Sequence, residues 1–233
     1  MSGGVGPTCD IALAGDESES KAQSAAPRRR GFFTYHHLNS AAIVIVLSAS
    51  GMIAMEDVLF VLLSSLYLLF ISKFSFPSDP SDPDPPVFGE RNRILGVYVL
   101  VGAAVGVFLP VAYVFGGILE GDKEGIRAAA PHLFLLACQI LAEGVSFAGG
   151  FSLPIRVFVP VLYNSRRMLS IWEWLRDEFS KSSDGGGRRS MVAFGRGLAA
   201  ANLGFWSFNL LGFLLPFYLP KAFRIYYSKN KTK

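Results

Sequence analysis

The sequence predicts an all-α fold, a polytopic membrane helix bundle of four to five hydrophobic elements with an interfacial amphipathic helix. Two observations carry this prediction. Only 17% of the 233 residues are charged, whereas a soluble domain carries about 25%. The apolar residues also lie in long uncharged runs, at 38–55, 58–72, 94–119, 128–142 and 197–220. A run of roughly 18 or more apolar residues is typical of a membrane helix. A large soluble helical domain is the less favoured alternative.

Residues 1–31 are expected to form a disordered cytoplasmic tail. They are rich in Gly, Ser and Ala and show no periodicity. No apolar core follows Met1, and this argues against a signal peptide. The tail carries four acidic residues, which disfavours a plastid transit peptide, and it ends in three arginines, Arg28–Arg30.

Residues 32–75 are predicted to form a helical hairpin of two spans. Its two apolar runs lie on either side of Glu56 and Asp57. Asp57 is expected to cap the second helix, because an aspartate can accept hydrogen bonds from free backbone N–H groups there. The segment 76–93 follows and is rich in Pro and Asp. It is expected to be an extended, solvated linker.

Residues 94–152 are predicted to hold two further spans. In the first of them, Gly102 and Gly106 lie four residues apart. Small residues at this spacing let helices approach closely in lipid, so this pair is expected to be a helix-packing face. Pro110 is expected to bend the same helix.

Residues 153–196 are predicted to form an amphipathic interfacial helix and a flexible basic loop. At 100° per residue, Val161, Met168, Trp172, Leu175 and Phe179 fall on one side of 161–179. The helix is therefore expected to lie in the membrane interface, with packing on a small extramembrane domain as the alternative. The residues expected to contact the membrane surface are Arg166, Arg167, Met168, Trp172, Trp174, Leu175 and Phe179.

Residues 197–220 are the last hydrophobic element, and 221–233 form a basic tail. Lys and Arg in the earlier loops alternate as expected for a cytoplasmic N-terminus. The basic tail breaks this alternation if 198–219 crosses the membrane once. The segment is therefore interpreted either as a span or as a re-entrant or hairpin element, which Gly204, Gly212 and Pro216 would permit.

A polar stripe is predicted inside the membrane. His132, Gln139, Glu143 and Ser146 share one face of a helix, which places Glu143 about 16 Å deeper than His132. A charged carboxylate near the bilayer centre costs at least ~2.5 kcal/mol, so Glu143 is expected to be neutral, paired or in a wet cavity. Two arginines, Arg156 and Arg196, are its candidate partners, and Asn202 and Asn209 are candidate partners for the stripe. A proton relay and a structural hydrogen bond are the two interpretations.

Signatures of enzymes and of metal or cofactor sites are absent from the sequence. It has no G-x-S-x-G, H-E-x-x-H or phosphate-binding loop motif. Two cysteines and three histidines provide neither a disulfide framework nor a histidine-rich metal site. We therefore expect no catalytic residues, no cofactor, no metal and no nucleic-acid partner.

Three stretches together resemble a family of uncharacterised plant multi-pass membrane proteins, defined by a domain of unknown function. They are VIVLSASGM (44–52), EGDKEGIRAAAPHLFLLACQ (120–139) and FSLPIRVFVPVLYNSRR (151–167). The resemblance covers about residues 31–222 and implies a plant membrane protein without assigned catalytic residues. More weakly, SLPIRVFVPVLYNSRRML is similar to a segment of endoplasmic-reticulum proteins that associate with membrane-shaping reticulons and nuclear pores.

These patterns favour a non-enzymatic function in the endomembrane system, with the endoplasmic reticulum as the expected location. The leading expectation is a scaffold or membrane-shaping protein that grips anionic lipid headgroups of the cytoplasmic leaflet. The alternative is a small proton- or ion-coupled transporter or channel that uses Glu143. The expected partners are the bilayer itself and either another membrane protein or a second copy of this chain.

Overall fold

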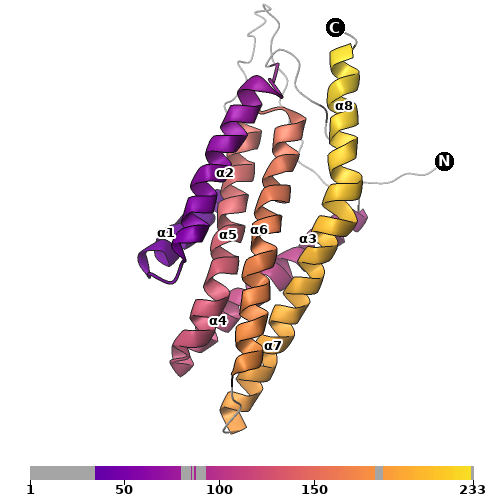
Figure 1. Ribbon diagram of the computed structural model, residues 1–233. Coiled ribbons are helices and arrows are strands. Elements are labelled where there is room, and N and C mark those ends of the chain that lie inside the picture. The colour runs from indigo at the N-terminus through magenta and orange to yellow at the C-terminus, as the bar shows by residue number, and fades with distance from the viewer. Residues whose placement is uncertain (1–34, 80–84, 86, 88–92, 182–185, 232–233) are drawn as a thin grey trace, which may run out of the picture. The chain divides into compact units, whose positions relative to one another are not determined.

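The computed structural model describes residues 35–79, 85, 87, 93–181 and 186–231, and every regular element in these ranges is helical (Figure 1). This confirms the predicted all-α helix bundle. The described helices belong to one unit of the chain, Phe32–Lys233. The predicted tail 1–31, most of the linker 76–93 and residues 182–185 of the predicted flexible loop lie outside the described residues.

Helices α1 (Tyr35–Ala49) and α2 (Met55–Phe74) form the predicted hairpin. Gly51 adopts a φ of 68° in the turn between them, a conformation that glycine accepts without strain. The prediction that Asp57 caps α2 is wrong, because the helix already begins at Met55. The carboxylate of Asp57 instead accepts a hydrogen bond from Arg166 Nε at 2.9 Å, which joins the hairpin to the helix that carries Arg166.

The segment from Arg93 to Glu120 is one continuous helical run with a π-helical turn inside it. It consists of α3 (Arg93–Ala103), η1 (Ala104–Phe108) and α4 (Leu109–Glu120). Pro110 has no backbone N–H to donate to the preceding turn. The carbonyls of Val105 and Gly106 accept hydrogen bonds from side chains of other helices instead. Such π-turns are frequent at functional sites.

Helices α5 (Lys123–Ala148) and α6 (Leu153–Ser180) lie antiparallel along the centre of the bundle (Figure 1). Helix α6, for which a place in the membrane interface was predicted, packs against α2, α5, α7, η2 and α8. Arg167 and Trp174, two of its predicted surface contacts, are fully buried. The face that α6 buries carries polar groups, whereas Trp172 and Phe179 point outward, 56% and 63% exposed.

Three other predicted surface contacts of α6, Arg166, Met168 and Leu175, also interact with residues of the bundle. Arg166 donates to Asp57 and lies 3.4 Å from Glu56. Met168 and Leu175 are partly buried against apolar clusters. Of the predicted surface contacts, only Trp172 and Phe179 have largely exposed side chains.

Helix α7 (Gly186–Ser207), η2 (Phe208–Tyr218) and α8 (Leu219–Lys231) follow one another without a break. This run lies antiparallel to α6. Arg196 contacts the last turn of α6, Trp206 its middle and Ala222 its first turns. The alternative of a re-entrant or hairpin element at 198–219 is therefore wrong.

The contacts between helices define two ends of the bundle. At the end that we call the 152 end, Ser152 Oγ donates to the carbonyl of Phe76 at 2.7 Å and Tyr226 OH donates to that of Pro77. At the opposite end, the 122 end, Lys181 lies 3.3 Å from Asp122. Four segments, α2, 96–120, α5 and 190–229, are long and apolar enough to cross a membrane. Helix α6 carries more charge but lies beside α5.

Gly102 and Gly106 both face α7 of the same chain. A Cβ atom built on Gly106 would lie 2.5 Å from Trp206, and one on Gly102 would lie 3.1 Å from Phe205. Gly96, which lies earlier in the same helical run, has open space around it. These glycines thus allow a close approach of two helices within the bundle.

We expect Gly106→Ala to lower the free energy of unfolding by about 1–3 kcal/mol, because the added methyl group must displace the Trp206 ring. The matched control, Gly96→Ala, meets no atom and should be neutral or stabilising by about 0.5–1 kcal/mol through helix propensity. Unfolding of the detergent-purified variants, followed by circular dichroism, measures both. Equal stability of the two variants would contradict the packing of Gly106 on Trp206.

Candidate functional site: a buried polar network and an adjacent cavity

The centre of the candidate site is Arg167, which is 0% exposed and lies halfway along α6. Its Nη1 donates to Gln139 Oε1 at 2.8 Å, and its Nη2 donates to Asn164 Oδ1 at 3.0 Å. The guanidinium carbon lies 3.8 Å from the centroid of the Trp206 ring, a cation–π contact. No ion pair joins Arg167 to any acid in the described part of the chain.

Glu143 is connected to Arg167 through the amide of Gln139. Gln139 Nε2 donates to Glu143 Oε1 at 2.8 Å, while Gln139 Oε1 accepts from Arg167. The amide group of Gln139 therefore donates a hydrogen bond to the carboxylate of Glu143 and accepts one from the guanidinium group of Arg167. Ser146 donates to the backbone carbonyl of Glu143 and does not contact the carboxylate.

The predicted partners of Glu143 do not contact it in the described ranges. Arg156 lies over the ring of Phe147 at 5.1 Å. Arg196 donates to the carbonyls of Glu178 and Lys181 at the 122 end. The sequence prediction that either arginine pairs with Glu143 is wrong, because α6 brings Arg167 to Gln139 instead.

His132 and Asn202 use the carbonyls that the π-turn η1 presents. His132 Nε2 lies 3.0 Å from the carbonyl of Gly106 and must carry the proton, since a carbonyl only accepts. Asn202 Nδ2 donates to Val105 at 2.9 Å, and its oxygen accepts from Trp206 Nε1 at 3.2 Å. Trp206 thus couples Asn202 to the Arg167 network.

Asn209 is separate from this network. It accepts a hydrogen bond from Tyr98 OH at 2.6 Å. The predicted contact between the asparagines and the Gln139–Glu143 face is wrong, since Arg167 and Trp206 lie between them. The sequence prediction did not identify Arg167 and Asn164 as buried members of this network. Their signal was the spacing of Asn164, Arg167 and Ser170, three residues apart on one helix face.

A second polar cluster lies at the 122 end around Glu178, which is fully buried. Its Oε1 accepts from Tyr113 OH at 2.5 Å and from Lys181 Nζ at 2.7 Å. Lys181 also lies 3.3 Å from Asp122 Oδ2. Arg196 donates to carbonyls in the last turn of α6, which lack partners within the helix. This cluster fixes α4, α6 and α7 to one another.

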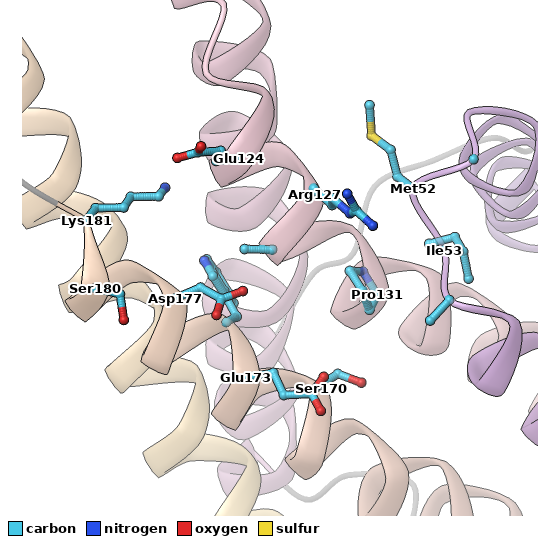
Figure 2. Close-up of a pocket in the computed structure, with 14 residues that line it drawn as sticks. Met52, Ile53, Glu124, Arg127, Pro131, Ser170, Glu173, Asp177, Ser180 and Lys181 are labelled. Carbon is cyan, nitrogen blue, oxygen red and sulfur yellow. The ribbon is translucent and has the colours of Figure 1, made fainter.

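A cavity of about 680 Å³ opens between the turn 51–54, the first turns of α5 and the last turns of α6 (Figure 2). Figure 2 shows Glu124, Arg127 and Pro131 on α5 and Ser170, Glu173 and Asp177 on α6 around the same space. Trp174 also lines it, and the Trp174 ring stacks on His132 with 6.0 Å between ring centroids. Ser170 lies one helix turn from Arg167. The cavity therefore shares a wall with the buried network.

Comparison with known proteins gives one family and no relative of established function. Neither a curated protein nor a solved structure matches the chain. One family model, described as a domain of unknown function, matches residues 33–227. This range covers every described helix of the site and confirms the resemblance to a family defined by such a domain. The chain belongs to the Domain of unknown function (DUF7733) family.

Proposed function

We propose that the protein is a multi-pass membrane transporter or channel of the plant endomembrane system, in which the Arg167–Gln139–Glu143 network couples a proton or ion to the movement of a small solute. The observation that carries the proposal is Arg167, fully buried at mid-helix without an ion pair among the described residues. An ionisable group in a membrane interior is costly, by at least ~2.5 kcal/mol, and is a functional-site hypothesis by default.

The outward surface supports a membrane location. Large apolar side chains of several helices point away from the bundle. They include Leu66, Phe70, Leu100, Phe115, Phe208 and Leu211, each more than half exposed. A soluble monomer does not usually expose so many large apolar groups on neighbouring helices, whereas lipid would cover them.

The amide of Gln139 provides a physical basis for coupling. While Glu143 is ionised it accepts from Gln139 Nε2, and this directs Gln139 Oε1 toward Arg167. A protonated Glu143 can donate instead, and the amide can then turn its oxygen toward Glu143. The turned amide would present two donors to the guanidinium, which cannot accept. Arg167 must then find another acceptor, so proton uptake at Glu143 changes the contacts of Arg167.

The test is transport by the purified full chain in liposomes. Uptake of protons, followed with a trapped pH-sensitive dye after addition of amino acids and small amines, should be lost in Glu143→Gln, because glutamine keeps the shape and cannot change charge. The control is Glu120→Gln, which alters an exposed acid at the end of α4. Full flux in Glu143→Gln would show that the coupling does not use this carboxyl group.

We further propose that the 152 end faces the cytoplasm, as does the N-terminal tail. Helix α6 starts at the 152 end and runs beside α5 to the 122 end, and the run of α7, η2 and α8 then returns the chain to the 152 end. Described cations lie at both ends, among them Lys73, Arg156 and Lys221 toward the 152 end and Arg127, Lys181 and Arg196 toward the 122 end. The proposed orientation therefore rests on Arg28–Arg30, which precede α1 in the sequence, because Lys and Arg are enriched in cytoplasmic segments.

Glycosylation tags check this orientation. In microsomes, a tag after Lys233 should remain unmodified, and a tag inserted between Gly121 and Asp122 should be glycosylated, because only the second faces the lumen. Protease protection of the same tags is the independent readout. A glycosylated C-terminal tag with an unmodified 121–122 tag would reverse the proposed orientation.

A scaffold function remains the second candidate, and α8 is the element that favours it. Helix α8 carries Lys221, Arg224, Lys229 and Lys231, and its Tyr227 is half exposed. Basic residues near anionic headgroups contribute about 1 kcal/mol each to binding. In this second candidate function, α8 rather than α6 would contact the membrane surface. Unchanged retention of anionic lipid after replacement of the four cations by Gln would exclude it.

A further inference from the structure

We propose that the cavity of Figure 2 binds a small zwitterion, a molecule with an ammonium group and a phosphate or carboxylate two or three bonds away. The proposal names a substrate class for the transport function above and rests on that function only for the movement of the ligand, not for its binding.

The charges that line the cavity are of both signs, and most of them have no partner among the residues that the structure describes. Glu124, Glu173 and Arg127 make no hydrogen bond or ion pair with the described residues. The ion pair of Asp177 is a surface contact of 4.0 Å with Arg176. Lys181 also lines the cavity, but its ammonium group already donates hydrogen bonds to Glu178, Asp122 and Tyr113. Three carboxylates and one guanidinium are thus available to a ligand.

The arrangement of the carboxylates favours an organic cation over a metal ion. Within the described ranges, no three His, Cys, Asp or Glu side chains lie close enough to hold one metal ion. Glu173 and Asp177 are one turn apart on α6, and Glu124 is on α5. An ammonium group with three N–H donors can satisfy separated carboxylates that do not converge on a point.

Arg127 provides the complementary site for the anionic group. It is on α5, across the cavity from Asp177 and Glu173 (Figure 2). A guanidinium binds phosphate or carboxylate through two parallel hydrogen bonds. A ligand that reaches from α6 to Arg127 must therefore carry opposite charges at its two ends.

Trp174 adds a third feature of a binding site. The indole is fully buried and lines the cavity, and it packs beside Tyr113 with 5.7 Å between the ring centroids. An indole next to a bound ammonium group contributes a favourable cation–π contact. The same ring stacks on His132. A ligand in the cavity would therefore contact a side chain that packs directly against the buried network.

Two sources supply this chemistry, a free zwitterion and the headgroup of an ethanolamine lipid. The probe for the first is phosphoethanolamine, titrated calorimetrically into the detergent-purified full chain, with ethanolamine and glycerol phosphate as single-charge comparisons. The probe for the second is the same protein in nanodiscs of phosphatidylethanolamine, where the occupied cavity should no longer bind phosphoethanolamine. Nanodiscs of phosphatidylglycerol serve as the control.

We expect phosphoethanolamine to bind and both single-charge comparisons to bind more weakly. Glu173→Gln/Asp177→Asn should weaken its binding about tenfold to a hundredfold, the effect of losing a hydrogen bond between charged groups. Arg127→Gln should weaken phosphoethanolamine to a similar extent and leave ethanolamine unchanged. The matched controls are Glu120→Gln and Arg176→Gln, which alter exposed groups outside the cavity wall. Circular dichroism verifies that each variant is folded.

The outcomes separate this inference from the transport proposal. Binding without any flux leaves the cavity assignment in place and removes the transport function. Flux without binding, or binding that none of the cavity variants weakens, overturns the cavity assignment. Equal binding of ethanolamine and phosphoethanolamine, with no effect of Arg127→Gln, overturns the requirement for a zwitterion.

Discussion

Replacing Arg167 with alanine is expected to lower the free energy of unfolding by about 2–5 kcal/mol, because it orphans two buried acceptors and leaves a cavity. The substitution removes a fully buried charge and leaves Gln139 Oε1 and Asn164 Oδ1 without their donors. A buried acceptor that loses its donor costs about 1–3 kcal/mol. The alanine also leaves a void against the Trp206 ring, whose cation–π contact is lost.

The measurement is unfolding of the purified protein in mixed micelles of mild detergent and increasing sodium dodecyl sulfate. Arg176→Ala is the matched control, because Arg176 is on the same helix with a 67% exposed side chain and should cost about 0–1 kcal/mol. Arg167→Met fills most of the volume without the charge and should be less destabilising than Arg167→Ala. If Arg167→Ala were as stable as Arg176→Ala, Arg167 would not be at the centre of the bundle.

The sequence predicted the helices better than it predicted their surroundings. Uncharged runs mark α2, the 94–119 helix, α5 and the last element, because length and apolar composition are local properties. The periodicity of 161–179 was also correct, since α6 is a helix with two unlike faces. A periodic pattern does not say which face points inward. The buried face of α6 is mixed: it contains Asn164 and Arg167 together with Ile171 and Trp174, whereas Trp172 and Phe179 face out.

The packing of α6 along α5 also decides which end of the bundle holds the cations of the C-terminal tail. With α6 in the interface, the cations of the C-terminal tail fell on the side opposite the N-terminal arginines. With α6 beside α5 along its length, α8 lies at the 152 end near Pro77, whereas Arg196 lies at the 122 end. The side of the C-terminal cations relative to the N-terminal arginines therefore depends on whether α6 crosses the membrane.

The candidate site was predictable only where its members are on one helix. Gln139 and Glu143 are four residues apart, so their contact follows from helix geometry. The contact of Gln139 with Arg167 joins two helices and depends on how far α6 is shifted along α5. Sequence spacing contains no information on that shift. The charged cavity was missed for the same reason, because its walls come from a turn and two helices.

The second large effect is expected at Glu178, where Glu178→Ala should lower the free energy of unfolding by about 3–5 kcal/mol. Glu178 is fully buried, and Lys181, its partner at 2.7 Å, has a side chain only 8% exposed. Removal of the carboxylate leaves the ammonium group of Lys181 buried with Asp122 at 3.3 Å as its remaining acid. It also leaves Tyr113 OH without the acceptor that it now reaches at 2.5 Å.

A double variant distinguishes the pair from simple loss of packing. Glu178→Leu/Lys181→Met replaces both charges with apolar groups and should recover most of the stability, because the destabilisation comes from the partner left unpaired. Asp177→Ala is the control, since its ion pair with Arg176 is exposed and contributes about 0–1 kcal/mol. The same micelle titration measures all three. The opposite outcome is a double variant that is less stable than Glu178→Ala. It would show that the Glu178–Lys181 ion pair itself stabilises the fold.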